Sequence, residues 1–138
     1  MKRFLCLDYG HRRIGVAVSD PLGITAQPVD TIPVDDPEKV FDAIAAIAAE
    51  REVGKIVVGL PLNMDGSEGD TAAEVRAFAA QLEVRVGVEI VFWDERLSTQ
   101  AVNRAMMEDN MRRRRRRARK DVMAAVIILQ TYLDFLSR

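Results

Sequence analysis

The chain has 138 residues, enough for one domain with a buried core, and 49% of them are hydrophobic and 30% charged. This composition is that of an ordinary globular protein and excludes a disordered or fibrous chain. A single cysteine, Cys6, excludes an intrachain disulfide, and with a single histidine, His11, it argues against structural zinc. No apolar run could span a bilayer, so we expect no membrane partner, and one lone cysteine inside a predicted strand fits a protein of the reducing cytoplasm. We expect a single domain over residues 1–138.

The net charge of −1 conceals a strong asymmetry along the chain. Residues 112–120 hold eight basic side chains and no acidic one, which leaves 12 basic and 21 acidic residues elsewhere, a net of −9. A solvated basic loop is one interpretation of such a run. Because the run leads directly into the acidic residue Asp121, we favour contact with nucleic-acid phosphates, without sequence readout.

The first third of the chain predicts three strands. The apolar run 4–8 is typical of a buried central strand, and the turn 10–13 connects it in a hairpin to a second strand over 14–18. A third strand is expected within residues 24–34. Two prolines in that stretch favour a position at the edge of the sheet.

Helices and strands alternate after this point. Asp36 and Pro37 predict the cap and first position of a helix that Gly54 would end. A short buried strand is expected over residues 55–59. The polar stretch 61–70 follows as a loop, at the edge where ligands bind in such sheets.

A second helix, a last strand and further helices complete the prediction. Thr71 to Glu74 fit a capping box for a helix that stops near Gly87. The strand 88–94 follows, and another helix is expected from about Ser98 or Thr99.

The final predicted helix covers residues 122–136 and is apolar over a wide arc. Asp121 would open it, either as a simple cap or in line with the side chains that face the core. The order of elements predicts an α/β fold. Its five-stranded mixed sheet has three antiparallel strands, then two parallel ones, and helices cover both faces.

Acidic residues stand at three ends of these core elements. Asp8 ends the first strand, Asp94 and Glu95 close the last one, and Asp121 opens the final helix. A carboxylate at the end of a buried strand is costly unless a cation or hydrogen bonds satisfy it. Oxygen ligands suit hard divalent cations, so the pattern points to a metal site and phosphoryl chemistry.

Four ordered segments resemble those of the YqgF/RuvX family, over about residues 3–136. The segments are Asp8-Tyr9-Gly10 with Arg13-Ile14-Gly15-Val16-Ala17, Val58-Gly59-Leu60-Pro61-Leu62-Asn63-Met64-Asp65-Gly66, Asp94-Glu95-Arg96-Leu97-Ser98-Thr99, and Lys120-Asp121-Val122-Met123-Ala124-Ala125. The resemblance implies the RNase H-like fold. Family members are described as Holliday junction resolvases and as nucleases that mature the 5′ end of pre-16S rRNA in ribosome biogenesis.

The resemblance also implies a catalytic, metal-binding set of Asp8, Glu95 and Asp121. Asp94 is an alternative or additional ligand, but neighbouring residues of a strand point to opposite faces, so Asp94 and Glu95 should not both reach one metal. The expected chemistry is phosphodiester hydrolysis with one or two Mg²⁺ or Mn²⁺ ions, which activate a water and stabilise the leaving oxygen.

Basic and polar residues near this set are expected to position phosphates. For Arg96, a salt bridge to Asp94 or Glu95 is an equal alternative. The expected nucleic-acid-binding residues are Arg12, Arg13, Asn63, Arg96, Arg112, Arg113, Arg114, Arg115, Arg116, Arg117, Arg119 and Lys120.

Structured RNA, above all pre-16S rRNA, is the favoured substrate, and the assembling small ribosomal subunit is a further expected partner. A DNA junction is the alternative. A resolvase would cut a junction as a dimer, whereas rRNA trimming needs only a monomer, so both a monomer and a weak homodimer stay open.

Two other classes of protein compete with a nuclease. Asp8 and Gly10, followed by Ser19 and Asp20, also resemble the phosphate-binding hairpin of actin-like ATPases and sugar kinases, but 138 residues supply only one of the two lobes needed. The other competitor is a non-catalytic RNA-binding assembly factor. The complete acidic set argues against it, because carboxylates repel phosphate.

Overall fold

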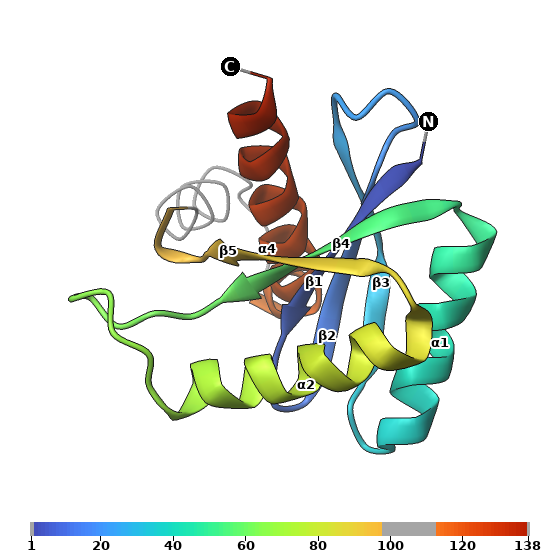
Figure 1. Cartoon of the computed structure of the whole chain (residues 1–138). Helices are drawn as coiled ribbons and strands as arrows, with labels where there is room; N and C mark the ends of the chain where they lie inside the picture. The colour runs from blue at the N-terminus through green and yellow to red at the C-terminus, as the bar shows by residue number, and fades with distance from the viewer. Residues whose placement is uncertain (1, 98–112, 138) are drawn as a thin grey trace.

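Five strands form one mixed sheet in the order β3-β2-β1-β4-β5 (Figure 1). The computed structural model describes residues 2–97 and 113–137, the latter with side chains from residue 122. β1, β2 and β3 run antiparallel, while β1, β4 and β5 run parallel, so the predicted mixed sheet is confirmed. The strands are β1 (Arg3–Tyr9), β2 (Arg13–Ser19), β3 (Ala26–Pro33), β4 (Val53–Leu60) and β5 (Glu89–Asp94).

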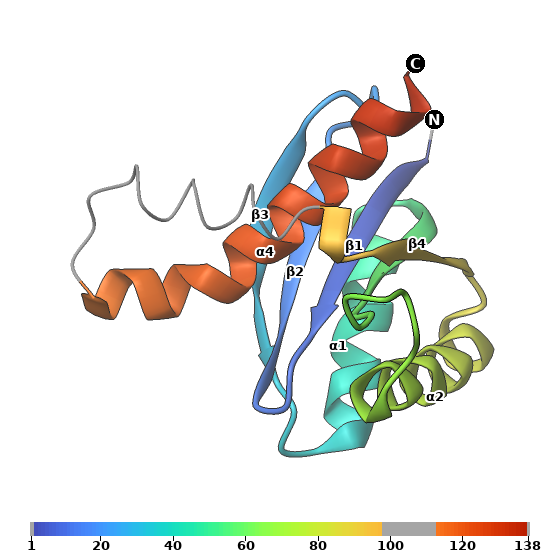
Figure 2. The same cartoon turned by 90° about the vertical axis from the view of Figure 1, so that its left-hand side faces the viewer.

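Helices cover both faces of this sheet (Figures 1 and 2), as predicted. One face packs against α1 (Pro37–Glu50) and α2 (Asp70–Val86), and the other against α4 (Arg113–Leu136). The apolar run of β1 serves both cores, because Leu5 and Leu7 face α1 and α2 whereas Cys6 faces α4. β3 stands at the edge, where its prolines were expected.

The start of α1 was predicted correctly and its end was not. Asp36 caps the helix by accepting a hydrogen bond from the backbone N–H of Glu38 at 3.1 Å, and Pro37 follows at the first position. The helix ends at Glu50, and Glu52 then turns the chain with φ 54°. Gly54 lies inside β4, where a Cβ would come 2.7 Å from the side chain of Lys2. The glycine therefore makes room for a neighbour and does not end the helix.

α2 begins and ends at glycines. Gly69 is its N-cap without a side-chain hydrogen bond, and Asp70 supplies a negative charge to the first turn, so the predicted capping box at Thr71 is wrong. The acidic side chain complements the helix dipole in place of the box. Gly87 ends the helix in the left-handed conformation at φ 72°, as predicted.

α4 reaches further toward the N-terminus than predicted. It includes residues from Arg113 onward, so Asp121 does not open it and the basic run is not a loop. Arginine, lysine and alanine are strong helix formers, which explains why the helix continues through this run. Arg112, one of the expected phosphate-binding residues, lies outside the described residues. Ser98 and Thr99, where another helix was expected to begin, lie outside them as well, and Arg96 and Leu97 just before them have helical backbone.

Side-chain hydrogen bonds fasten α4 across the sheet to the start of β3. Oε1 of Gln130 accepts from the backbone N–H of Ala26 at 2.9 Å, and its Nε2 donates to the carbonyl oxygen of Ile24 at 3.0 Å. Leu129 beside it is fully buried. In the part of the chain that the structure describes, no helix has the length and apolar character needed to cross a membrane.

We expect Asp20 to stabilise the turn between β2 and β3 in a pH-dependent way. Its carboxylate accepts hydrogen bonds from the backbone N–H groups of Thr25, Ile24 and Leu22, which lowers the pKa of Asp20 below its ordinary value of 3.8. The stabilisation is therefore present above pH 3.8 and is lost as the pH falls through the lowered pKa.

Thermal unfolding of Asp20→Ala across pH 2–7 checks this expectation. At pH 7 the variant should melt below the wild type, and the difference should shrink at acid pH. The control Glu50→Ala removes an exposed carboxylate at the end of α1. A difference in melting temperature that stays constant down to pH 2 would contradict the assigned role.

Candidate functional site

Asp8 lies on the face of the sheet that α4 covers. Side chains alternate between faces along a strand, and Cys6 belongs to the core beneath α4. Asp8 follows two residues later and is half-buried. Its carboxylate therefore stands on the α4 side, at the carboxyl end of β1.

Gly59 leaves room for a second carboxylate at this place. β4 runs parallel to β1 and pairs Val58 with Leu7, so the next residues along, Gly59 and Asp8, come level with each other. A Cβ at Gly59 would lie 2.7 Å from Oε1 of Glu95 and 3.0 Å from Cδ1 of Ile128 in α4. The Glu95 side chain thus occupies the space that a larger residue in β4 would fill.

Two half-buried carboxylates therefore share one region, which we call the acidic corner (Asp8 and Glu95). Burial raises the pKa of the Cys6 thiol well above its ordinary value, and the negative charges of Asp8 and Glu95 raise it further. Like charges above an apolar floor repel each other, and a divalent cation bound by both would remove that repulsion. An all-oxygen donor set fits Mg²⁺ or Mn²⁺.

The path of α4 brings Asp121 toward the same end of the sheet. The rings of Tyr132 and Phe4, at the start of β1, lie 5.7 Å apart, whereas Ile128, one turn earlier, reaches Gly59 at the end of β4. Asp121 comes two turns before Ile128, about 10 Å along the axis. Its side chain is outside the description, and the described side chains alone form no group of three or more His, Cys, Asp or Glu that could hold a metal ion.

Asp94 faces the opposite side of the sheet from Glu95. Phe92 packs against the core under α1 and α2, and Trp93 against the core under α4, so alternation sends Asp94 and Glu95 apart. The Asp94 carboxylate accepts hydrogen bonds from Nη2 of Arg96 at 2.7 Å and from its Nε at 3.1 Å, which lowers the pKa of Asp94. The salt bridge, expected as one alternative for Arg96, is thereby confirmed.

Asn63 and Arg96 hold the loop that follows β4. The backbone N–H of Asn63 donates to the carbonyl oxygen of Ser67 at 2.9 Å, and its Nδ2 donates to the hydroxyl of Ser67 at 3.0 Å. Nη1 of Arg96 donates to the carbonyl oxygen of Met64 at 3.2 Å. Both residues, expected to contact phosphate, thus also build this loop beside the acidic corner.

The turn between β1 and β2 places Arg12 and Arg13 just beyond Asp8. Gly10 permits this tight turn, because a Cβ there would lie 2.7 Å from the backbone oxygen of Arg13. Both arginines are exposed, and residues 10–13 line a hollow of about 250 Å³. Exposed guanidinium groups at this position suit contact with phosphate.

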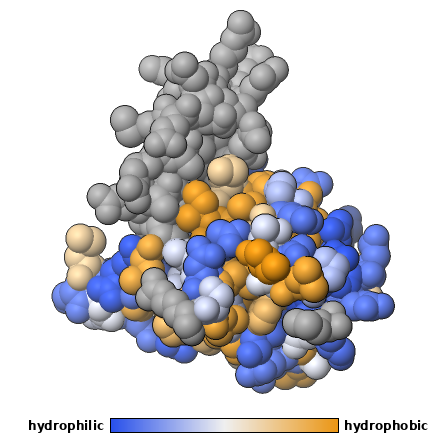
Figure 3. Space-filling model, turned by 90° about the horizontal axis from the view of Figure 1, so that it is seen from above, coloured by the Kyte–Doolittle hydropathy of each residue, from blue (hydrophilic) through white to orange (hydrophobic). Residues whose placement is uncertain are grey.

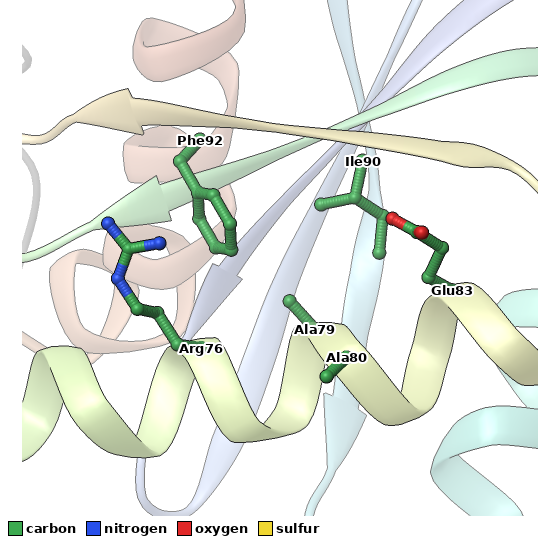
Figure 4. Close-up of a pocket in the computed structure, with 6 residues that line it drawn as sticks. All are labelled: Arg76, Ala79, Ala80, Glu83, Ile90 and Phe92. Atoms are coloured by element: carbon green, nitrogen blue, oxygen red, sulfur yellow. The ribbon is translucent and has the colours of Figure 1, made fainter.

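Another hollow, of about 300 Å³, lies between α2 and β5 (Figure 4). Arg76, which lines it, forms two hydrogen bonds with Glu68, at 2.6 and 2.9 Å, and lies 4.8 Å from the centre of the Phe92 ring. This hollow is across the sheet from Asp8 and Glu95. It is therefore separate from the candidate site.

Sequence reasoning missed the part that Gly59 plays. A glycine near the end of an otherwise apolar strand often marks a place where another group approaches closely, and that signal was available. The position of Cys6 below both carboxylates was also missed. Alternation along β1 from Asp8 would have shown that the two residues share a face.

A family model described as "RuvX: Holliday junction resolvase" matches residues 2–135. The chain belongs to the RuvX family. Proteins of this family are resolvase-like nucleases, hydrolases that act on phosphodiester bonds, so the family and enzyme class predicted from the four segments are confirmed.

RuvX relatives match nearly the whole chain. A protein of Listeria monocytogenes named "Putative pre-16S rRNA nuclease" is 46% identical over 134 residues, which is 96% of this chain and 97% of the relative. A protein of Myxococcus xanthus with the same name is 48% identical over 132 residues, covering 96% and 87% respectively.

The fold is also found in a resolvase whose sequence is very different. Thermus thermophilus RuvC, solved in complex with a Holliday junction substrate, matches with a TM-score of 0.64 at 12% identity, covering 99% of this chain and 96% of that chain. This likeness confirms the predicted RNase H-like fold.

Arg96→Ala should loosen the loop after β4 without unfolding the protein. The substitution removes the ion pair with Asp94 and the hydrogen bond to Met64, and exposed ion pairs contribute little to the stability of the whole fold. We expect amide hydrogen exchange at Asn63, Gly66 and Ser67 to accelerate about fivefold, because the loop opens more easily without these contacts.

Arg85→Ala is the matched control for this measurement. Arg85 makes an equally close pair with Glu38, at 2.6 Å, between α1 and α2. Its loss should leave exchange in the loop unchanged. Equal exchange in the loop of Arg96→Ala and the wild type would show that Arg96 does not hold it.

Proposed function

We propose that the chain is a metal-dependent nuclease that processes the 5′ end of pre-16S rRNA. The observation that carries the proposal is the acidic corner, where Glu95 lies over the bare backbone of Gly59 beside Asp8. Two carboxylates held together on an apolar floor suit a bound cation and oppose direct contact with phosphate. A pure RNA-binding module would gain nothing from this arrangement.

Asp8, Glu95 and Asp121 would hold Mg²⁺ or Mn²⁺. Asp8 and Glu95 project from the ends of two parallel-running strands, and α4 contributes Asp121 from the facing layer. When bound, the metal acidifies a water and stabilises charge on the phosphate. Asp94 is left out of the set because its carboxylate is paired with Arg96 on the other face.

Substrate phosphates would be attracted from two sides of the acidic corner. Arg12 and Arg13 stand in the turn directly beyond Asp8. The basic run, which includes Arg113–Arg117, Arg119 and Lys120, belongs to the first half of α4. Attraction of this kind favours a nucleic-acid backbone irrespective of its sequence.

The choice of RNA follows the name shared by the relatives, which refers to pre-16S rRNA. A substrate of this kind places the chain in the cytoplasm with the assembling small ribosomal subunit, and one protomer is sufficient for trimming. A Holliday junction is the second candidate substrate. It is favoured by the family description and by the likeness in fold to RuvC.

Cleavage assays on two substrates test the proposal. Purified protein with Mn²⁺ or Mg²⁺ is incubated with an RNA that carries the extended 5′ end of 16S rRNA, and separately with a four-way DNA junction. We expect RNA cleavage that needs the metal and falls by about a hundredfold or more in Asp8→Asn and Glu95→Gln, which lose a ligand charge. Asp94→Asn weakens only the pair with Arg96 and should lose far less activity than either variant, while Glu89→Gln, at an exposed position at the start of β5, is the matched control and should behave like the wild type.

Other outcomes assign a different function. Cutting of the junction alone would make the chain a resolvase. Binding of the RNA without cleavage, unchanged in Asp8→Asn, would make it an assembly factor and refute the nuclease. Activity that depends on Asp94 and survives loss of Glu95 would reverse the assignment of the ligand.

Gly59→Ala should weaken metal binding while the protein stays folded. The new methyl group would come 2.7 Å from the Glu95 carboxylate and 3.0 Å from Ile128, and both are ends of flexible side chains that can move aside. We expect Mn²⁺ affinity by calorimetry to fall about 10- to 100-fold, as for other changes that displace a ligand from its place.

Thermal unfolding is measured in parallel, without metal. The control Gly54→Ala adds the same methyl group to β4 against Lys2, far along the strand from the acidic corner. It should leave Mn²⁺ affinity unchanged. Wild-type affinity in Gly59→Ala would show that Glu95 does not need this space to bind metal.

A further inference from the structure

Met64 is exposed to a degree unusual for an apolar side chain. Its fractional exposure is 94%, the highest among the large apolar side chains in the described ranges. Leu22, Ile24, Phe135 and Leu136 are also exposed, but they belong to the β2–β3 turn and the end of α4. Seen from above, the molecule shows apolar and polar patches side by side (Figure 3). Met64 lies at the other end of the molecule, in the loop after β4.

Several hydrogen bonds within residues 63–67 hold the loop that carries Met64. The carbonyl of Asn63 accepts from the N–H of Gly66 at 2.8 Å, and Gly66 turns the chain at φ 89°. The Asp65 carboxylate accepts from the N–H of Ser67 at 2.9 Å and from its hydroxyl at 2.6 Å. These bonds fix the backbone of the loop on both sides of Met64.

Arg96 ties the loop to the acidic corner. It donates to the carbonyl oxygen of Met64 itself and pairs with Asp94, and Glu95 stands between Asp94 and Arg96 in the sequence. Figure 2 shows the loop on one side of the end of β1 and the first half of α4 on the other. A nucleic-acid strand bound at Asp8 would therefore pass beside Met64.

Met64 adds little to the stability of its own loop. Ordering the backbone costs conformational entropy, and Met64 offsets little of that cost because it buries almost no surface. Methionine is among the apolar side chains that nucleic-acid-binding proteins place against bases or insert between them. Its flexible thioether adapts to a flat aromatic surface.

We propose that Met64 contacts the face of a nucleobase next to the scissile phosphate and so sets the position of the substrate in the acidic corner. This inference rests on the proposed nucleic-acid substrate. Met64 is a positioning residue: it supplies apolar contact, while Asp65, Ser67, Asn63 and Arg96 keep its backbone in place. The partner is an unstacked or terminal base, whose face is open to contact.

Fluorescence of 2-aminopurine tests the contact without the need for cleavage. The base analogue is placed on either side of the cleavage site in the 5′-extended 16S RNA, and at the branch point of the four-way DNA junction. Each probe is titrated with Asp8→Asn protein that carries Met64, Met64→Ala, Met64→Leu or Met64→Gln. Val84→Ala, which removes an 85% exposed apolar side chain on α2, is the matched control.

We expect the fluorescence of one probe position to change on binding. Met64→Ala and Met64→Gln should abolish the change and weaken binding about fivefold to tenfold, somewhat less than the loss of an aromatic stacking residue. Met64→Leu and Val84→Ala should behave like the parent, and the melting temperatures of all variants should agree. In the active protein, Met64→Ala should raise KM more than it lowers kcat.

Failure of the contact and failure of the nuclease proposal give different results. Fluorescence that does not change on binding, or changes equally with Met64→Ala, overturns the contact alone. If the wild type binds but cuts neither substrate, the nuclease proposal is overturned, and the effect of Met64→Ala on the fluorescence still decides whether Met64 contacts the base. Absence of binding to both probes overturns both proposals.

Discussion

The space that Gly59 leaves for Glu95 is the constraint around which the carboxyl end of the sheet is built. Asp8 and Glu95 stand on one face because β1, β4 and β5 run parallel and side chains alternate along each strand. Gly59 leaves the space that Glu95 occupies, and buried Cys6 lies on the same face, where burial and the two carboxylates raise the pKa of its thiol.

Most of the fold could be predicted because apolar patterning decides it. The run in β1, the prolines of β3 and the cap at Asp36 are local signals that tertiary packing reinforces. One error falls where tertiary contacts override local preference. Gly54 looked like a helix end, yet it makes room for Lys2. The start of α4 was misplaced for a different reason: the charge of the basic run drew attention away from the strong helix propensity of its residues.

The sequence predicts which residues belong to the candidate site, but it does not predict how they are arranged in space. Asp8 and Glu95 were identifiable from strand ends, and alternation alone indicated that Asp94 and Glu95 would separate. Which of the two shares a face with Asp8 depends on the cores into which Phe92 and Trp93 pack, and that is a property of the whole sheet. The roles of Arg96 and Asn63 in the loop depend on contacts across more than one element, which no short motif encodes.

The split between Asp94 and Glu95 gives one strand end two tasks. Glu95 turns toward α4 and completes the acidic corner, while Asp94 turns the other way and fixes Arg96, which holds the loop of Met64. Because Asp94 and Glu95 are adjacent, the loop of Met64 and the acidic corner are both attached to the same end of β5. The end of β5 would therefore position both a base that contacts Met64 and a phosphate that lies near Asp8. Positioning both groups from one short backbone segment would align the reacting bond without a large binding surface.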